Sequence, residues 1–285
     1  MIQERIKIQV QGSEDYAHLD TYVLGRYLDD DPNPKKPLVL ICPGGAYKMT
    51  SNREAEPIAL QFNSIGYHAA VLRYSCKPAV YPTALLEVAK CVQFIREKGE
   101  EWGVDTEKIL VMGFSAGGHL AASLGVFWNK GEITKALEVS AEEIRPNGMI
   151  LSYPVITSGQ YGHQESFRNL LGERYEELRE KMSLENQVDQ DTPRTFIWHT
   201  FEDTTVHPEN SLSFVRSMVK YGVPVEYHLF PEGIHGIGLG NELTANPDGR
   251  GIVKACGEWS CLCEKWLNRE FPWWDQKNKE NCLFM

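Results

Sequence analysis

One short motif, Gly113-Phe114-Ser115-Ala116-Gly117, constrains the fold of this 285-residue chain more than any other stretch. It follows the apolar run 109–112, which reads as a strand, and it precedes a helix-prone run. A glycine two positions before and another two positions after the serine indicate a strand-to-helix turn too tight for larger side chains. Such a turn exposes the serine hydroxyl at the sheet edge and places the Ala116 amide at a helix start, where negative charge is favoured. The plain alternative is a glycine-rich turn with an incidental serine.

Strands and helices alternate along most of the chain. Two stretches of alternating polarity, 6–10 and 19–24, predict antiparallel strands, and 29–37 predicts a turn. Apolar runs predict further strands at 37–42, 68–74, 149–154, 195–200 and 225–230, and helical spacing predicts helices at 54–65, 82–99, 210–221 and 252–271. This alternation predicts one α/β domain over residues 1–285, with a mostly parallel central sheet and helices on both faces.

Two segments depart from the alternation. Residues 155–192 are too long for a bare loop and contain a charged helical stretch at 166–182, so we expect a small lid-like insert near the active site. Residues 272–285 form an aromatic and then polar tail. Its Trp273 and Trp274 could stack on a sugar, but packing against the body or a partner chain is favoured, which leaves a homodimer open.

The composition excludes several classes of protein. A net charge of −10 without a basic block argues against a nucleic-acid partner. No apolar run approaches the ~18 residues of a membrane span, and the first residues lack an apolar signal core. The seven cysteines are scattered without the spacing of a zinc or redox pair, so we expect reduced thiols and a cytoplasmic location.

A second glycine turn, Pro43-Gly44-Gly45-Ala46-Tyr47, follows the strand at 37–42. Successive small residues after a central strand let the backbone turn its N–H groups outward. We predict that the amides of Gly45 and Ala46, together with that of Ala116, form an oxyanion hole. Gly44 is the alternative donor if the register shifts by one, and a plain tight turn is the alternative for the whole loop.

A serine hydroxyl becomes a useful nucleophile only beside a base that an acid orients. Asp203 lies three residues past the strand at 195–200, and His235 lies between two glycines just past the strand at 225–230. Because the carboxyl ends of parallel strands share one edge, both should lie near Ser115. Glu202 competes with Asp203 for the acid, whereas Asp189 and Asp191 precede the strand and lie at its wrong end.

The remaining histidines fit a site less well. His199 and His207 flank Asp203 at four-residue intervals, which would suggest a metal-binding face only on a helix. This segment reads as strand and turn, and Pro208 follows, so we predict no metal there. His119 is expected to pack beneath the serine turn.

These motifs together resemble those of a known family, the α/β-hydrolase esterases grouped with acetylxylan esterases and the BD-FAE carbohydrate esterases. The resemblance rests on Cys42-Pro43-Gly44-Gly45-Ala46-Tyr47, Gly113-Phe114-Ser115-Ala116-Gly117-Gly118-His119-Leu120-Ala121, Ser152-Tyr153-Pro154, Trp198-His199-Thr200 with Asp203 and Val206, and Phe230-Pro231-Glu232-Gly233 with His235-Gly236. It implies an α/β-hydrolase fold in which nucleophile, acid and histidine follow one another in that order along the chain. It also implies no metal and no organic cofactor.

The function that the resemblance implies is a serine carboxylester hydrolase acting on short acyl esters through an acyl-enzyme on Ser115. Acetylated sugars or xylo-oligosaccharides are the expected substrates. One alternative is a small peptidase of the prolyl-oligopeptidase type, although this chain has no room for the gating domain such enzymes usually carry. The other is a non-catalytic α/β-hydrolase-fold binding protein, which typically lacks one of the three site residues.

Overall fold

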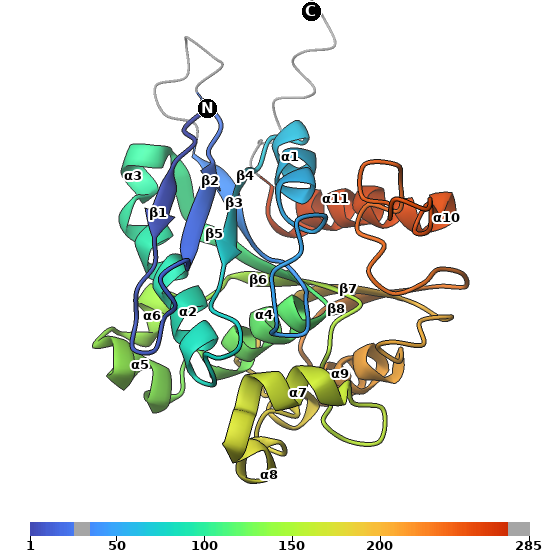
Figure 1. Cartoon of the computed structure of the whole chain (residues 1–285). Coiled ribbons are helices and arrows are strands. Elements are labelled where there is room, and N and C mark those ends of the chain that lie inside the picture. Colours follow the sequence, from blue (N-terminus) through green and yellow to red (C-terminus); the bar gives the residue numbers. More distant parts are fainter. Residues whose placement is uncertain (26–34, 273–285) are drawn as a thin grey trace, which may run out of the picture.

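A single eight-stranded sheet runs through the computed structural model, which describes residues 1–25 and 35–272 (Figure 1). The strand order across the sheet is β1-β2-β4-β3-β5-β6-β7-β8. The strands are β1 (Arg5–Lys7), β2 (His18–Tyr22), β3 (Lys36–Cys42), β4 (His68–Arg73), β5 (Val104–Phe114), β6 (Gly148–Ser152), β7 (Thr195–Thr200) and β8 (Val225–Phe230). The first two strands pair antiparallel with their neighbours, and all pairs from β4 to β8 are parallel. The predicted mostly parallel sheet is therefore confirmed.

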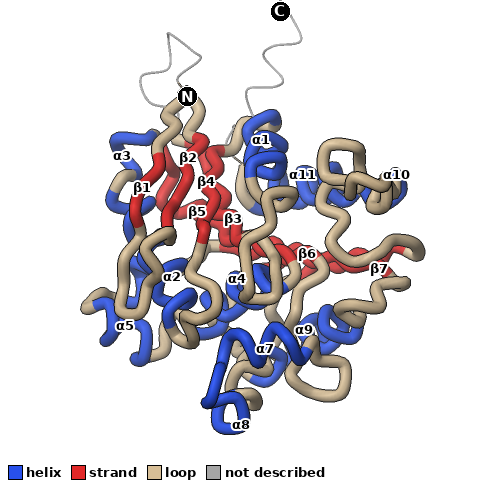
Figure 2. The backbone as a smooth tube through the Cα atoms, in the orientation of Figure 1, coloured by secondary structure: helices blue, strands red, loops and turns tan. Residues whose placement is uncertain are grey.

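Helices cover both faces of this sheet (Figure 2). The helices are α1 (Glu56–Ser64), α2 (Thr83–Glu97), α3 (Gly99–Trp102), α4 (Ala116–Phe127), α5 (Gly131–Leu137), α6 (Ala141–Ile144), α7 (Gln164–Leu171), α8 (Tyr175–Leu178), α9 (Glu209–Lys220), α10 (Lys254–Gly257) and α11 (Trp259–Glu270), with single 3₁₀ turns at Gly172–Arg174 and Leu184–Asn186. In β3, Leu38 and Leu40 join the core under α2, α4 and α9, while Val39 and Ile41 join the core under α1 and α11. Burial on both faces explains why the central strands are continuous apolar runs rather than alternating ones.

The structure differs from the sequence prediction in three places. The first strand is β1 rather than 6–10. The stretch predicted as one helix at 166–182 is α7, a 3₁₀ turn and α8, because Gly172 ends α7 with a φ of +55°. The closing helix predicted at 252–271 is divided into α10 and α11, and the N–H of Val253 just before α10 is bonded to the carbonyl of Gly240.

Two expectations fall wholly or mostly outside the described residues. They are the turn at 29–37 and the tail at 272–285. Among the helices of the described chain, none combines the length and the apolar character that crossing a bilayer requires.

Two buried histidines should make the stability of this fold depend on pH. In His68, Nδ1 accepts the Leu24 N–H and Nε2 faces the Gly103 carbonyl; in His119, Nε2 faces the Met182 carbonyl. Burial lowers the pKa of each ring from 6.5 to about 4. Because the unfolded chain binds these protons first, stability is full above pH 6.5 and is lost as the pH falls toward 4. We expect a loss on the order of 2–3 kcal/mol per histidine between pH 6.5 and 4.5.

Urea denaturation at pH 7.5, 6.5, 5.5 and 4.5 measures this loss. His68→Gln and His119→Gln should each flatten the pH profile, even where the variant is less stable at pH 7.5. Profiles as steep as that of the unchanged chain would contradict the assignment.

Candidate active site

Ser115 lies between β5 and α4. Its backbone has φ 53° and ψ −120°, a conformation that residues other than glycine rarely adopt. The two flanking glycines make this turn possible. A Cβ on Gly113 would lie 2.0 Å from the Gly117 carbonyl oxygen, and a Cβ on Gly117 would lie 2.1 Å from the Cys42 carbonyl oxygen. Both distances are far below van der Waals contact, so the tight turn inferred from the motif is a steric requirement of this packing.

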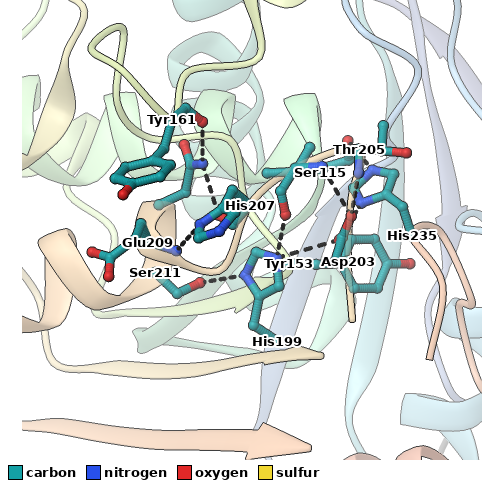
Figure 3. A network of polar contacts seen from close by, with 12 residues as sticks. Ser115, Tyr153, Tyr161, His199, Asp203, Thr205, His207, Glu209, Ser211 and His235 are labelled. Carbon is teal, nitrogen blue, oxygen red and sulfur yellow. Dashed lines mark hydrogen bonds and ion pairs between the residues drawn. The ribbon is translucent and has the colours of Figure 1, made fainter. Parts of the chain in front are cut away.

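Three side chains from distant parts of the sequence form a continuous hydrogen-bonded chain (Figure 3). Nε2 of His235 lies 2.8 Å from Oγ of Ser115, and Nδ1 of His235 lies 2.6 Å from Oδ2 of Asp203. Ser115 follows β5, Asp203 follows β7 and His235 follows β8, so the three meet where parallel strands end. This geometry can pass the serine proton to the imidazole while the carboxylate holds the ring in place.

Asp203 is held by donors on both carboxylate oxygens. Oδ1 accepts the backbone N–H groups of Thr205 and Val206, each at 2.9 Å, and Oδ2 faces both His235 and His199. Burial alone would raise the pKa of Asp203, but hydrogen bonds with the two histidines outweigh it and hold the pKa well below its usual range. The group is therefore an anion at neutral pH.

His199 is a fully buried histidine behind the carboxylate. Its Nε2 lies 2.8 Å from the Val206 carbonyl and 3.3 Å from Oδ2 of Asp203, so it carries the proton. Its Nδ1 accepts from Ser211 Oγ at 2.7 Å. Burial lowers the pKa of His199, which keeps the ring neutral. The ring thus fixes the turn that carries Asp203.

The loop after β3 lies next to the serine turn. Gly45, Ala46 and Tyr47 all have positive φ, at 134°, 54° and 53°. The N–H of Gly44 donates to Oε2 of Glu54 at 2.9 Å, so this amide is already occupied. Within the described part of the chain, the N–H groups of Gly45 and Ala46 have no acceptor. These two amides remain available to a bound oxyanion.

Glu54 connects this loop to the loop that carries His235. Its Oε1 accepts the hydroxyl of Tyr153 at 2.7 Å, and the Tyr153 oxygen accepts the N–H of Gly238 at 3.0 Å. Burial, together with the nearby Glu54 charge, raises the pKa of Tyr153 well above its usual value, so the phenol stays a donor. The Tyr153 ring also packs edge-on against His235, with ring centroids 5.1 Å apart. One buried carboxyl group therefore positions both loops.

Replacing Glu54 by glutamine tests this connection. One acceptor oxygen becomes a donor, so either the Gly44 N–H or the Tyr153 hydroxyl loses its partner. We expect kcat for an ester to fall about tenfold, less than the 10²–10³-fold loss of an oxyanion donor itself, with KM nearly unchanged. The free energy of unfolding should fall by about 1–3 kcal/mol.

The matched control is Glu56→Gln, two residues along, where an exposed carboxylate accepts the Tyr22 hydroxyl at 3.3 Å. It should change neither kcat nor stability appreciably. If Glu54→Gln loses stability but keeps its kcat, Glu54 supports the fold without positioning the site.

The other residues considered from the sequence lie elsewhere. His119 lies under the site, where its Nδ1 accepts from the Tyr47 hydroxyl at 2.9 Å. Glu202 accepts the N–H of Gly233 at 3.3 Å rather than contacting His235. His207 stacks on Tyr161, apart from His199.

Sequence reasoning missed Glu54, Tyr153, His199 and Ser211 as parts of this site. Tyr153 and His199 carried a signal, because each lies at or just past the end of a central strand. Glu54 and Ser211 carried none, since their partners are contributed by distant segments of the chain.

A known protein family matches more than half of the sequence. The model of the BD-FAE family matches residues 24–218. The chain belongs to the BD-FAE family. The predicted resemblance to this family and the predicted α/β-hydrolase fold are thereby confirmed.

Named relatives support this BD-FAE assignment. The chain is 37% identical to endo-1,4-β-xylanase B of Butyrivibrio fibrisolvens over 76% of its own length and 34% of the relative's. It is 29% identical to an acetylxylan esterase of Xylanibacter ruminicola over 80% of its length and 46% of the relative's. The chain therefore spans between a third and a half of the length of these two curated relatives.

Solved structures with other names share the fold of this chain. A carboxylesterase of Lactobacillus plantarum has a TM-score of 0.82 and 27% identity, covering 94% of this chain and 98% of that one. An acetyl ester-xyloside bifunctional hydrolase of Caldicellulosiruptor lactoaceticus has a TM-score of 0.76 and 36% identity, covering 89% and 88%.

Proposed function

We propose that this chain hydrolyses short carboxylic esters, with Ser115 as nucleophile, His235 as general base and Asp203 as the acid that orients it. The observation that carries the proposal is the hydrogen-bonded chain from Ser115 Oγ through both nitrogens of His235 to Oδ2 of Asp203. The side chain of Asp203 is fully buried and that of His235 is 16% exposed, so water competes little for the hydrogen bond between them. An incidental serine would not need this arrangement.

In the first step, Ser115 Oγ forms a bond to the ester carbonyl carbon while His235 Nε2 takes its proton. The carbonyl π pair moves to the oxygen, and the amides of Gly45, Ala46 and Ala116 bind that oxyanion. Ala116 opens α4, so its N–H has no acceptor one turn earlier in the helix. Asp203 stabilises the imidazolium that forms.

In the second half, the tetrahedral adduct collapses and the carbon–oxygen bond to the alcohol breaks. His235 gives its proton to the leaving alkoxide, which departs as an alcohol. A water molecule then attacks the acyl-enzyme, His235 accepts its proton, and collapse releases the carboxylic acid and restores Ser115. Every proton that His235 accepts is returned, so the cycle is balanced.

Acetyl groups on sugars or xylo-oligosaccharides are the proposed substrates. Support comes from two similar proteins, an acetylxylan esterase and an acetyl ester-xyloside bifunctional hydrolase. A cytoplasmic location and a homodimer stay predictions.

Initial rates on 4-nitrophenyl esters of increasing acyl length, on acetylated xylo-oligosaccharides and on a dipeptide anilide test the proposal. We expect the acetate ester to have the highest kcat/KM among the nitrophenyl esters, acetate release from the oligosaccharide, and no cleavage of the anilide. Faster cleavage of the anilide would favour a peptidase. Failure to cleave any ester, with no fluorophosphonate adduct on Ser115, would favour a binding protein.

A further inference from the structure

One wall of the candidate site is the segment that follows β6. It begins at Val155, whose N–H donates to the Ser115 carbonyl at 3.0 Å. Eight residues later it reaches His163, a half-buried ring. Burial lowers the pKa of His163, and the positive charge that His235 carries when protonated lowers it further. Because His235 is proposed to protonate the leaving alcohol, a side chain of this segment on the His235 side of Ser115 would meet the alcohol part of the substrate.

An aromatic pair stands on this wall. Tyr161 stacks on His207 with ring centroids 4.4 Å apart and an angle of 22° between the planes. Figure 3 draws both residues together with Ser115, and the dashed line at Tyr161 ends on its backbone carbonyl. Tyr161 is nevertheless 43% exposed. The near-parallel stack covers one face of the Tyr161 ring. The exposed surface of Tyr161 therefore leaves room for a ligand on the opposite face of the ring.

A single buried amide holds the backbone of both residues. Asn210 Oδ1 accepts the N–H groups of Ile156 and Thr157 at 2.9 and 3.0 Å, and its Nδ2 donates to the carbonyls of Tyr161 and His207 at 3.0 and 2.9 Å. All four hydrogen bonds that an asparagine side chain can make are therefore formed. The Asn210 side chain is fully buried.

The same pair is connected to Asp203 through the backbone. His207 follows Val206 directly, and the Val206 N–H donates to Oδ1 of Asp203. The pair is thus fixed relative to the Asp203–His235 couple before any substrate arrives. A preorganised surface of this kind loses little conformational freedom when it binds a ligand.

We propose that the Tyr161–His207 pair is a subsite for a neutral pyranose ring in the alcohol part of the substrate. The proposal rests on the ester hydrolase function above and names the ligand of one part of that site. The C–H groups on one face of a pyranose match the π face of an aromatic ring, while the hydroxyls at its rim stay in water. Tyrosine suits this contact because it offers a rigid apolar face with a polar tip.

The test compares two acetyl esters with the same acyl group and different alcohols. They are an acetylated xylo-oligosaccharide and 4-nitrophenyl acetate, which has no sugar. Tyr161→Ala should lower the ratio of kcat/KM for the oligosaccharide to kcat/KM for the nitrophenyl ester by about 3- to 10-fold, through KM for the oligosaccharide. Tyr161→Phe keeps the ring and should keep the ratio.

Tyr221→Ala is the matched control, because Tyr221 is a similarly exposed tyrosine at 47% and lies at the end of α9, where Lys220 packs over its ring. It should leave the ratio unchanged. An equal effect of Tyr161→Ala on both substrates, or no effect on either, would overturn the subsite.

Failure of the subsite can be distinguished from failure of the proposed sugar deacetylation. If the unchanged chain cleaves 4-nitrophenyl acetate but not the acetylated oligosaccharide, sugar deacetylation fails. Calorimetric titration with unacetylated xylotetraose then decides the subsite on its own. Binding that Tyr161→Ala abolishes and Tyr161→Phe retains would support the subsite, and absence of binding to the unchanged chain would overturn it.

Discussion

Ser115→Ala is expected to lower kcat for 4-nitrophenyl acetate on the order of 10⁵- to 10⁶-fold, the largest effect of any single substitution in this chain. The alanine methyl group cannot form the bond to the acyl carbon. The remaining amides of the proposed oxyanion hole can stabilise only direct attack by water. Alanine differs from serine only in lacking the hydroxyl group, so the backbone of the turn should be kept. The free energy of unfolding should therefore change by less than about 1 kcal/mol.

Two measurements separate loss of chemistry from loss of fold. Urea denaturation should give the same midpoint for Ser115→Ala and the unchanged chain, and a fluorophosphonate probe should label only the latter. A variant that keeps a tenth or more of the original rate would remove Ser115 from the mechanism.

Asp203→Asn is expected to lower kcat about 10⁴-fold while leaving KM almost unchanged. Oδ1 of Asp203 accepts two backbone N–H groups, from Thr205 and Val206. The asparagine oxygen must stay there, because the NH₂ group would otherwise face those two donors. The NH₂ group therefore replaces Oδ2 and points at Nδ1 of His235. His235 then carries its proton on Nε2 and cannot accept the proton of Ser115.

The matched control is Glu202→Gln, the neighbouring carboxyl group that the sequence left as a competitor. It should keep kcat within about twofold, since its contact is with a backbone amide. If instead Glu202→Gln loses the larger factor, the acid has been assigned to the wrong residue. Measurements at neutral pH suffice, because the lowered pKa of Asp203 keeps its stabilising charge present above about pH 4.

The parts of the fold and the site that could be predicted are those that local sequence determines. A glycine on each side of Ser115 is a steric demand that can be read within five residues. The approach of Asp203 and His235 followed from a topological rule, because residues just past parallel strands share one edge. Neither inference needed a distance, and the structure places all three side chains in hydrogen-bond contact.

The remaining features depend on contacts between segments far apart in sequence. Glu54 lies 99 residues from Tyr153, its hydrogen-bond partner, and nothing near Glu54 distinguishes it from a surface acid at a helix start. The break after α7 depends on one left-handed residue, Gly172, in a stretch whose charge pattern is otherwise helical. The sequence left open whether Gly44 is one of the amides that would bind the oxyanion. The hydrogen bond from the Gly44 N–H to Glu54 shows that this amide already has an acceptor.

Segment 155–192, predicted to be a lid-like insert, is hydrogen-bonded to other parts of the chain at several points. The carbonyl of Met182 faces Nε2 of buried His119, and Asn169 donates to the carbonyl of Ala46 at 2.8 Å. At its other end, Asn210 holds Tyr161. A segment held in this way would have to break these hydrogen bonds before it could move at an oil–water boundary. Hydrolysis should therefore follow the concentration of dissolved ester, without the jump in rate that emulsified fats produce in lipases that open at an interface.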